Sequence, residues 1–381
     1  MSVPKRFTVL LILVCIFYPV FLFSQAFSFN INGYAKNLAI RSNSVVSNES
    51  FFLNITRFRT KGLLDFDKRI HSEVWLDNEL LAGNFLSSAD FKFGQMLQRP
   101  SFADLDWTIT EGKNYQARQS LFRAFATVYL GPGEVTVGRQ RIAWGTGFAW
   151  NPTDLLNPFN PAAIELEERE GVDAVYAVMP FGSLSRVEAA FAPGRNELKS
   201  SAAVRVSSNF WGYDVAFIAG DFQEDKVIGG DFAGYLSGAG FRGEFAYTWK
   251  EEGKNSLRAV LNVDYNFSHD IYALVEFYYN GQGATDPAKY DLQDLVSGRT
   301  FNLGRHYFAM SLAKSLTPLL RVSVYSIANL NDRSSLIGPV LTYSLANNLE
   351  LAASAYFFRG SEQSEYGLLK SAYFGFLQFY F

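Results

Sequence analysis

The segment from Phe241 to Lys250 reads Phe-Arg-Gly-Glu-Phe-Ala-Tyr-Thr-Trp-Lys, and its side chains alternate between apolar or small and mostly polar. A β-strand points successive side chains to opposite faces, so this period is typical of a strand with one apolar and one wet face. The run from Leu257 to Phe267 repeats the pattern. Both runs have about ten or more residues, which a tilted membrane-spanning strand needs, whereas sandwich strands usually have about five to six. The two runs therefore predict transmembrane β-strands.

The same alternation continues along the chain and predicts about 18 strands, with 16 as the alternative. Short turns are expected near residues 65–68, 131–133, 180–183, 208–212, 235–239, 268–270, 314–318 and 346–348. Mostly longer links are expected between them, near residues 41–50, 81–117, 144–171, 192–200, 221–225, 251–255, 281–305, 329–334 and 359–369. Strict alternation of short and long connections is the pattern of an outer-membrane barrel with periplasmic turns and larger outer loops. The sequence therefore predicts an all-β fold, a transmembrane antiparallel β-barrel with both termini in the periplasm.

The amino terminus has the features of a targeting segment. Lys5 and Arg6 precede an apolar run over residues 7–23, and small residues stand before a cleavage point after Ala26. We expect a signal peptide over residues 1–26 and one barrel domain over residues 27–381. The alternative is a retained helix, for which 17 residues are near the lower limit for spanning a membrane. Cys15 is the only cysteine, so cleavage leaves a chain without disulfides or cysteine chemistry.

The composition limits the classes of partner. Aromatic residues make up 16% of the chain, with 36 Phe and 20 Tyr, which fits the two aromatic girdles of a barrel in contact with outer-membrane lipids. The net charge of −3 gives no reason to expect a nucleic-acid partner, which would favour a basic surface. The outer membrane of a Gram-negative bacterium is the expected location.

The last strand carries a local signal at the carboxyl end. Alternate residues Tyr373, Leu377, Phe379 and the terminal Phe381 share one face. A terminal phenylalanine behind alternate apolar residues resembles the signal read by the bacterial barrel-assembly machinery. The resemblance implies that machinery and periplasmic chaperones as partners. An ordinary hydrophobic strand of a soluble protein is the alternative.

Most charged residues stand at those alternate positions of the predicted strands whose side chains point away from lipid. Arginine or lysine on the lipid face would cost about 2–4 kcal/mol each at mid-membrane, so these side chains are expected inside the barrel. The predicted lumen-facing residues are Arg57, Arg59, Arg123, Arg186, Glu188, Arg205, Arg242, Glu244, Arg258, Asp264 and Arg321. They would either form ion pairs that only satisfy one another or make a wall that guides a polar or charged solute.

The link over residues 144–171 differs from an ordinary solvated loop. It contains three Asn-Pro steps and the aromatic residues Trp144, Phe148, Trp150 and Phe159, and it follows Arg139 and Arg141, which have the parity of a lipid face. A bulge, a change of face or the end of the strand must accommodate these arginines. We expect this loop to fold inward and to form a pore constriction with Arg139, Arg141, Trp144, Trp150, Asp154, Glu165, Glu167 and Glu168. An outer loop capped by its own aromatics is the alternative.

This region also carries a family resemblance. Arg139, Gln140, Trp144 and Gly145, followed by Asn151-Pro152-x-Asp154 and Asn157-Pro158, resemble a pattern in poorly characterised Gram-negative outer-membrane barrels, described as porin-like or alginate-export-like. The resemblance covers about 35 residues. It implies a barrel in the outer membrane and does not specify a substrate.

Three classes of function are compared. The leading hypothesis is a porin-like channel for passive or weakly selective passage of small polar or anionic solutes, because an 18-stranded barrel is wide enough for an aqueous path. The alternative is a gated exporter or conduit for a polymer or a hydrophobic molecule. An enzyme is not expected, since His71, His269 and His306 have no catalytic pattern around them, and neither a metal site nor a cofactor is predicted. Both a homotrimer and a monomer stay open.

Overall fold

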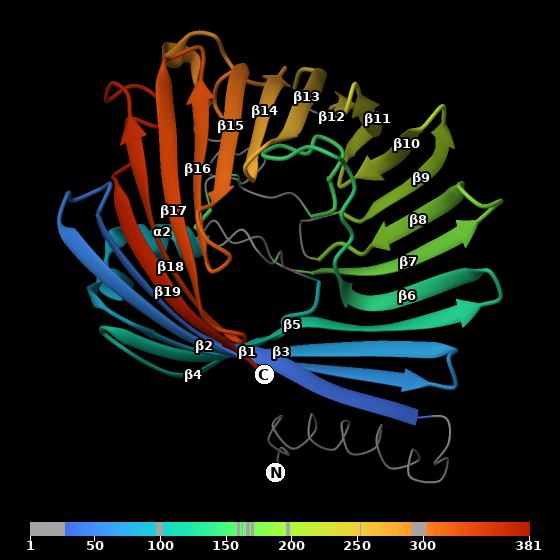
Figure 1. The fold of residues 1–381 in the computed structure, drawn as a ribbon, viewed down its shortest axis with the longest axis horizontal. Helices are drawn as coiled ribbons and strands as arrows, with labels where there is room; N and C mark the ends of the chain where they lie inside the picture. Colours follow the sequence, from blue (N-terminus) through green and yellow to red (C-terminus); the bar gives the residue numbers. More distant parts are fainter. Residues whose placement is uncertain are drawn as a thin grey trace.

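The strands form a closed barrel. The computed structural model describes residues 27–96, 102–157, 161, 163–164, 168, 171–195, 199–251, 253–291 and 302–381. Eighteen antiparallel strands make the ring, and the last pairs with the first (Figure 1). The prediction of about 18 strands is confirmed. In the part of the chain that the structure describes, no helix is both long enough and apolar enough to cross a membrane.

The wall of the barrel follows the order of the chain. Each strand pairs with its neighbours in sequence, apart from one short strand described below, and the register Tyr34↔Tyr380 to Arg41↔Tyr373 closes the ring. The strands are β1 (Phe27–Asn43), β2 (Ser50–Phe66), β3 (Ile70–Ala82), β5 (Tyr115–Leu130), β6 (Gly133–Gln140), β7 (Val172–Pro180), β8 (Arg186–Ala192), β9 (Ser201–Phe210), β10 (Tyr213–Phe222), β11 (Asp225–Leu236), β12 (Ala239–Trp249), β13 (Ser256–Phe267), β14 (Ile271–Asn280), β15 (His306–Ser315), β16 (Leu320–Asn329), β17 (Ser334–Ala346), β18 (Leu349–Arg359) and β19 (Ala372–Tyr380).

The predicted short turns are confirmed, but the links between β10 and β11 and between β16 and β17 are no longer than those turns, so the alternation of short and long connections is not strict. All eight expected short turns join consecutive wall strands, from β2–β3 to β17–β18, to within a few residues. Asp67 and Lys68 both have positive φ, 47° and 52°, and so do His269 and Asp270, at 65° and 56°. This geometry matches the twist of tight hairpins. Because the number of wall strands is even, β1 begins on the side of the barrel where β19 ends.

The link between β3 and β5 has structure that the sequence did not predict. It contains the 3-10 helix η2 (Asn84–Ser87), the helix α2 (Ala89–Met96) and the strand β4 (Asp106–Gly112). β4 pairs with residues 115–120 of β5, whereas β6 pairs with residues 124–130. β4 therefore extends the sheet along the part of β5 that the shorter β6 does not reach.

The two faces of the wall have the predicted characters. Phe245 and Trp249 on β12, and Leu261 and Val263 on β13, are exposed on the outside. Glu244 on β12 and Asn262 on β13 lie at the opposite parity and are buried. The alternation in the sequence thus separates a lipid-facing exterior from a polar interior.

Candidate functional site: the lumen wall and the inward loop

The connection between β6 and β7, residues 141–171, is called the inward loop here. Its described residues pack against the inner face of the wall in two places. Ile142 and Trp144 join a buried cluster with wall residues of β7–β12, such as Ala190 and Ala246. Ala149 and Trp150 join a second cluster with residues of β13–β18. Figure 1 shows the described part of this loop, in green, inside the ring of strands. The predicted inward fold is confirmed.

Trp150 is the largest side chain in the second contact. Its ring stacks on Tyr278 with centroids 4.9 Å apart, and its indole N–H donates to Asn302 at 2.9 Å. Only 5% of Trp150 and 4% of Trp144 is exposed. Trp144 and Trp150, two of the aromatic residues that suggested an inward fold, therefore anchor the loop to the wall.

Two wall carboxylates hold the backbone of the inward loop. Glu276 on β14 accepts hydrogen bonds from the backbone N–H groups of Phe148, Ala149 and Trp150, at 2.6, 2.8 and 3.1 Å. Glu244 on β12 accepts from the Thr153 hydroxyl at 2.7 Å. These carboxylates fix the loop rather than face the open lumen.

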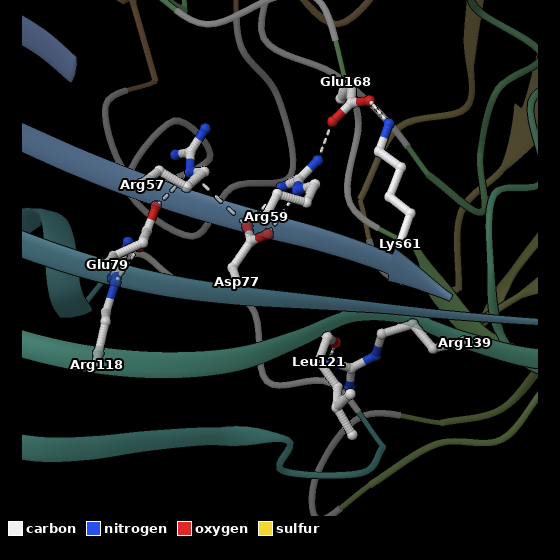
Figure 2. Close-up of polar contacts among 9 residues, drawn as sticks. All are labelled: Arg57, Arg59, Lys61, Asp77, Glu79, Arg118, Leu121, Arg139 and Glu168. Carbon is white, nitrogen blue, oxygen red and sulfur yellow. Dashed lines mark hydrogen bonds and ion pairs between the residues drawn. The ribbon is translucent and has the colours of Figure 1, made fainter. Parts of the chain in front are cut away.

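Strands β2, β3 and β5 form a different part of the wall, and we call its five cations the basic wall: Arg57, Arg59, Lys61, Arg118 and Arg123. Figure 2 shows the first four of them. Alternation along β2 places its three cations on the inner face. Arg57 and Arg118 both donate to Glu79, at 2.6 and 2.5 Å, and Arg59 binds Asp77 through Nε and Nη2, at 2.5 Å each. These acids are side chains of β3, so the strand between β2 and β5 supplies the counter-charges.

Aromatic rings support the basic wall from within. The Arg59 guanidinium lies 3.6 Å from the centroid of Phe122, and Lys61 Nζ lies 3.9 Å from that of Trp75. Arg123 also lies over Trp75, at 4.2 Å. Phe122 is the extra residue at an irregularity in the β3–β5 register, and its ring stacks on Trp75. Cation–π contacts of this kind stabilise a cation by about 0.5–2 kcal/mol. The sequence analysis missed these rings, because a bulge changes the face of a residue without any clear local signal.

Glu168 of the inward loop reaches the basic wall. Its carboxylate contacts the Arg59 guanidinium and lies 2.8 Å from Lys61 Nζ (Figure 2). Of the three glutamates predicted for the constriction, Glu168 is described, and Glu165 and Glu167 lie outside the described residues. The loop and the wall therefore meet through an acid and two cations.

The other predicted constriction residues lie in different places. Arg139 has no contact with Glu168, the described glutamate of the predicted constriction: its guanidinium donates to Asp173 at 2.9 Å and to the carbonyl oxygens of Ala103 and Leu121. It keeps the outward parity of Val137, and the chain just before β4 covers it, so no change of face was needed. Arg141 is exposed and lies near enough to Arg123 to repel it, whereas Asp154 is buried.

Most of the remaining predicted lumen residues, together with Asp231, which was not predicted, form the paired wall: Arg186, Glu188, Arg205, Asp231, Arg242, Glu244, Arg258 and Asp264. Arg205 bridges Glu188 at 2.6 Å and Asp231 at 3.2 Å, and Arg242 is paired with Asp264. Arg258 donates to the carbonyl oxygen of Pro152 in the inward loop. A cavity of about 590 Å³ lies beside Arg186, Arg205 and Thr146. Arg321 on β16 is exposed.

The carboxyl-terminal strand closes the barrel as expected for its position. Tyr373, Leu377, Phe379 and Phe381 are all 42–54% exposed on the outer side. The backbone of Phe381 exchanges two hydrogen bonds with Gly33, and its ring stacks on Phe58 with centroids 5.3 Å apart. Recognition of this strand by an assembly machinery stays a prediction.

Comparison with known proteins gives a match in structure and none in sequence. No protein-family model and no curated protein sequence matches the chain. The chain is similar to the outer membrane protein OprD from Pseudomonas aeruginosa, with a TM-score of 0.61, 10% identity, and coverage of 94% of this chain and 95% of that one. It is also similar to OccK5 (OpdH) of Pseudomonas aeruginosa, with a TM-score of 0.60, 9% identity, and coverage of 93% and 97%. For OccAB3 of Acinetobacter baumannii the TM-score is 0.58 at 10% identity, with coverage of 93% and 99%.

At these identities the likeness concerns the fold. The resemblance to porin-like outer-membrane barrels, expected from the residues around Trp144 and Asn151, is thereby confirmed at the level of architecture. The chain has the 18-stranded barrel fold of outer-membrane porins.

Proposed function

We propose that the protein is an outer-membrane channel for small polar solutes, with a weak preference for anions. The observation that carries the proposal is the excess of cations on the basic wall. Its five cations face three inward acids on β3, namely Glu73, Asp77 and Glu79, and Glu168 of the inward loop is a fourth, so these groups together carry one net positive charge. A charged wall beside a low-dielectric surface concentrates counter-ions and speeds their entry.

The inward loop supports weak rather than strict selectivity. It packs against the paired wall and the inner face of β13–β18, so the basic wall borders the remaining path for solutes. Trp144 and Trp150, which anchor the loop, are buried and do not line a continuous apolar path through the barrel. This gives no support to the alternative of a conduit for a hydrophobic molecule.

Planar-bilayer recording of the refolded mature protein tests this proposal. We expect discrete conductance steps and, under a salt gradient, a reversal potential of the sign that indicates chloride preference. A correctly folded barrel that gives no conductance would contradict the channel, and cation preference would contradict the role of the basic wall.

We assign no reaction to the chain. His71 bonds to Asp65 and Glu73 at the end of β3, at 2.7 and 3.0 Å, in a chain of contacts that continues to Trp75. His269 lies in an exposed turn, and His306 contacts Asn331. Among the described residues, no group of three or more His, Cys, Asp or Glu side chains lies close enough together to hold a metal ion.

Two partners beyond lipids and solute are proposed. The outer face of β1 and β2 carries Asn37, Asn54 and Thr56, joined by hydrogen bonds of 2.8–2.9 Å. Polar side chains are costly against lipid, so we propose that a contact between subunits of a homotrimer covers them. A monomeric barrel in mild detergent would contradict this. For the barrel-assembly machinery, removal of Phe381 is expected to lower the amount of assembled barrel in cells.

A further inference from the structure

We propose that Glu168 is a tethered competitor: its carboxylate occupies the position on the basic wall where the carboxylate of a solute would bind. This inference rests on the proposed channel function and specifies how the inward loop controls one site within it. The binding site consists of Arg59 and Lys61 on β2, with Glu168 supplied by the loop across the lumen.

The hydrogen-bonding geometry of Arg59 identifies the site. A guanidinium offers several N–H donors in a fixed planar fork. Asp77 occupies one edge through Nε and Nη2, and Nη1 is turned toward Glu168 (Figure 2). Lys61 Nζ supplies a second cation to the same carboxylate at 2.8 Å. Two cationic donors that converge on one carboxylate form a site suited to any carboxylate of similar size.

The wall builds this site independently of Glu168. Arg59 is fixed by Asp77 and lies over Phe122, and Lys61 lies over Trp75. These partners come from the wall strands β3 and β5. The donors therefore keep their places when the glutamate leaves, and a solute would find a preformed site.

Burial shows that the site is covered in this conformation. The Arg59 side chain is only 2% exposed although it lies on the inner face of a wide barrel, whereas the side chain of Arg57, two residues earlier on β2, is 15% exposed. The Glu168 side chain is 28% exposed, so the covering group itself borders the lumen. A solute carboxylate can reach Arg59 only in exchange for Glu168.

The tether sets the strength of this competition. A group held on a loop acts on its site with an effective concentration on the order of mM. A free carboxylate must compete with that concentration, so its apparent dissociation constant rises in proportion. Removal of the tethered charge is therefore expected to strengthen binding of a free carboxylate several-fold.

Acetate inhibition of the chloride current tests the inference. In planar bilayers, the acetate concentration that halves the current is expected to be at least about threefold lower for Glu168→Gln than for the wild type. In an Arg59→Gln background the same change at Glu168 is expected to have no further effect, because the site itself is lost. Equal values for wild type and Glu168→Gln would overturn the inference.

A matched variant separates the site from the overall charge of the lumen. Glu134→Gln on β6 removes one negative charge from the lining of the cavity beside the paired wall, away from Lys61. It is expected to leave acetate inhibition at the wild-type value. If Glu134→Gln strengthened inhibition as much as Glu168→Gln, lumen charge alone would explain the effect and the tethered competitor would be refuted.

The two proposals fail in distinguishable ways. A wild-type barrel that does not conduct overturns the channel and this inference together. A wild type that conducts with anion preference, but whose acetate inhibition does not respond to Glu168→Gln, overturns only the inference. Heat-modified gel mobility of each variant establishes that the barrel being recorded is folded.

Discussion

The basic wall and the paired wall contain similar residues and handle charge differently. On the basic wall, five cations face three acids of β3 and Glu168 of the inward loop, and Arg59, Lys61 and Arg123 lie over Trp75 or Phe122. On the paired wall, four arginines face four carboxylates, and Arg205 alone bridges two of them. An arginine in a barrel lumen therefore indicates selectivity for anions only where the nearby carboxylates are fewer than the cations. Where the two are equal in number, the arginine stabilises the wall through ion pairs.

The largest expected effect is a loss of stability on the paired wall. Arg205→Ala leaves Glu188 and Asp231 without their shared cation, and both carboxylate side chains are only 4% exposed. Removal of one partner of a buried ion pair costs about 3–5 kcal/mol. Urea unfolding of the barrel in lipid vesicles measures this free energy. A loss below about 1 kcal/mol would show that water reaches this wall and that its pairing is not structural.

Glu365, a buried carboxyl group in an outer loop, differs from both walls in the way that its charge is neutralised. Glu365 accepts hydrogen bonds from the Tyr307 hydroxyl at 2.5 Å and from Asn329 at 2.7 Å, in the link between β18 and β19. Its hydrogen-bond partners are neutral groups, and none of the ion pairs among the described residues includes it. Burial raises the pKa of Glu365 to about 7, with Asp332 adding to the rise. The group is neutralised by a proton instead of by an arginine.

The sign of the pH effect follows from this raised pKa. In the unfolded chain the carboxyl has a pKa near 4.5, so the folded state binds an extra proton between about pH 4.5 and 7. The stabilisation is fully present below about pH 4.5 and is lost as the pH rises through about 7, a change of roughly 3 kcal/mol. Unfolding free energies of the wild type and Glu365→Gln at pH 5 and pH 8 measure it. The glutamine variant should lack this dependence; equal pH profiles for the two proteins would place the titration elsewhere.

The next effect is a change of selectivity on the basic wall. Arg59→Gln removes one of the five cations there, and we expect the anion-to-cation permeability ratio to fall about two- to fivefold, equivalent to roughly 0.4–1 kcal/mol. The reversal potential under a salt gradient gives this ratio. An unchanged ratio would mean that the field comes from elsewhere in the lumen.

The smallest effect is expected at Arg186, the matched arginine on the paired wall. Its side chain is 54% exposed and lies 3.5 Å from Glu188, which Arg205 already neutralises. Arg186→Gln removes the same charge as Arg59→Gln, and the permeability ratio is expected to change by less than about 1.5-fold because solvent screens the position. Equal changes in the permeability ratio for both variants would contradict the claim that the basic wall determines selectivity more than the paired wall does.

The regular parts of the barrel were predictable because their signals are local. Alternation along runs such as Leu257 to Phe267 and turn residues such as Asp67 and Lys68 fix strands and hairpins within a few residues of sequence. β4 was missed because its seven residues are fewer than a membrane strand needs and it lies within a long link. The residues just before β4 also cover Arg139, which the sequence analysis assigned to the constriction.

The site itself depends on contacts between distant residues. Glu168 and Arg59 are 109 positions apart, and alternation on β2 says which way Arg59 points without saying what meets it. The backbone donors that Glu276 binds lie 126–128 positions away. The sequence could predict an aromatic loop that folds inward, but the exact partners follow from the width and closure of the barrel.

The closing pair of strands has a consequence for how the protein folds. The seam joins Tyr34 to Tyr380, nearly the whole length of the described chain, whereas every other strand pair in the wall joins segments much closer in sequence. Loop-closure entropy must be met before such a contact contributes, so the seam forms late and the barrel closes slowly. Until then both edge strands offer unpaired backbone groups, the condition that favours misassociation between chains. A barrel of this kind is therefore most vulnerable to misassociation in the interval before β19 pairs with β1.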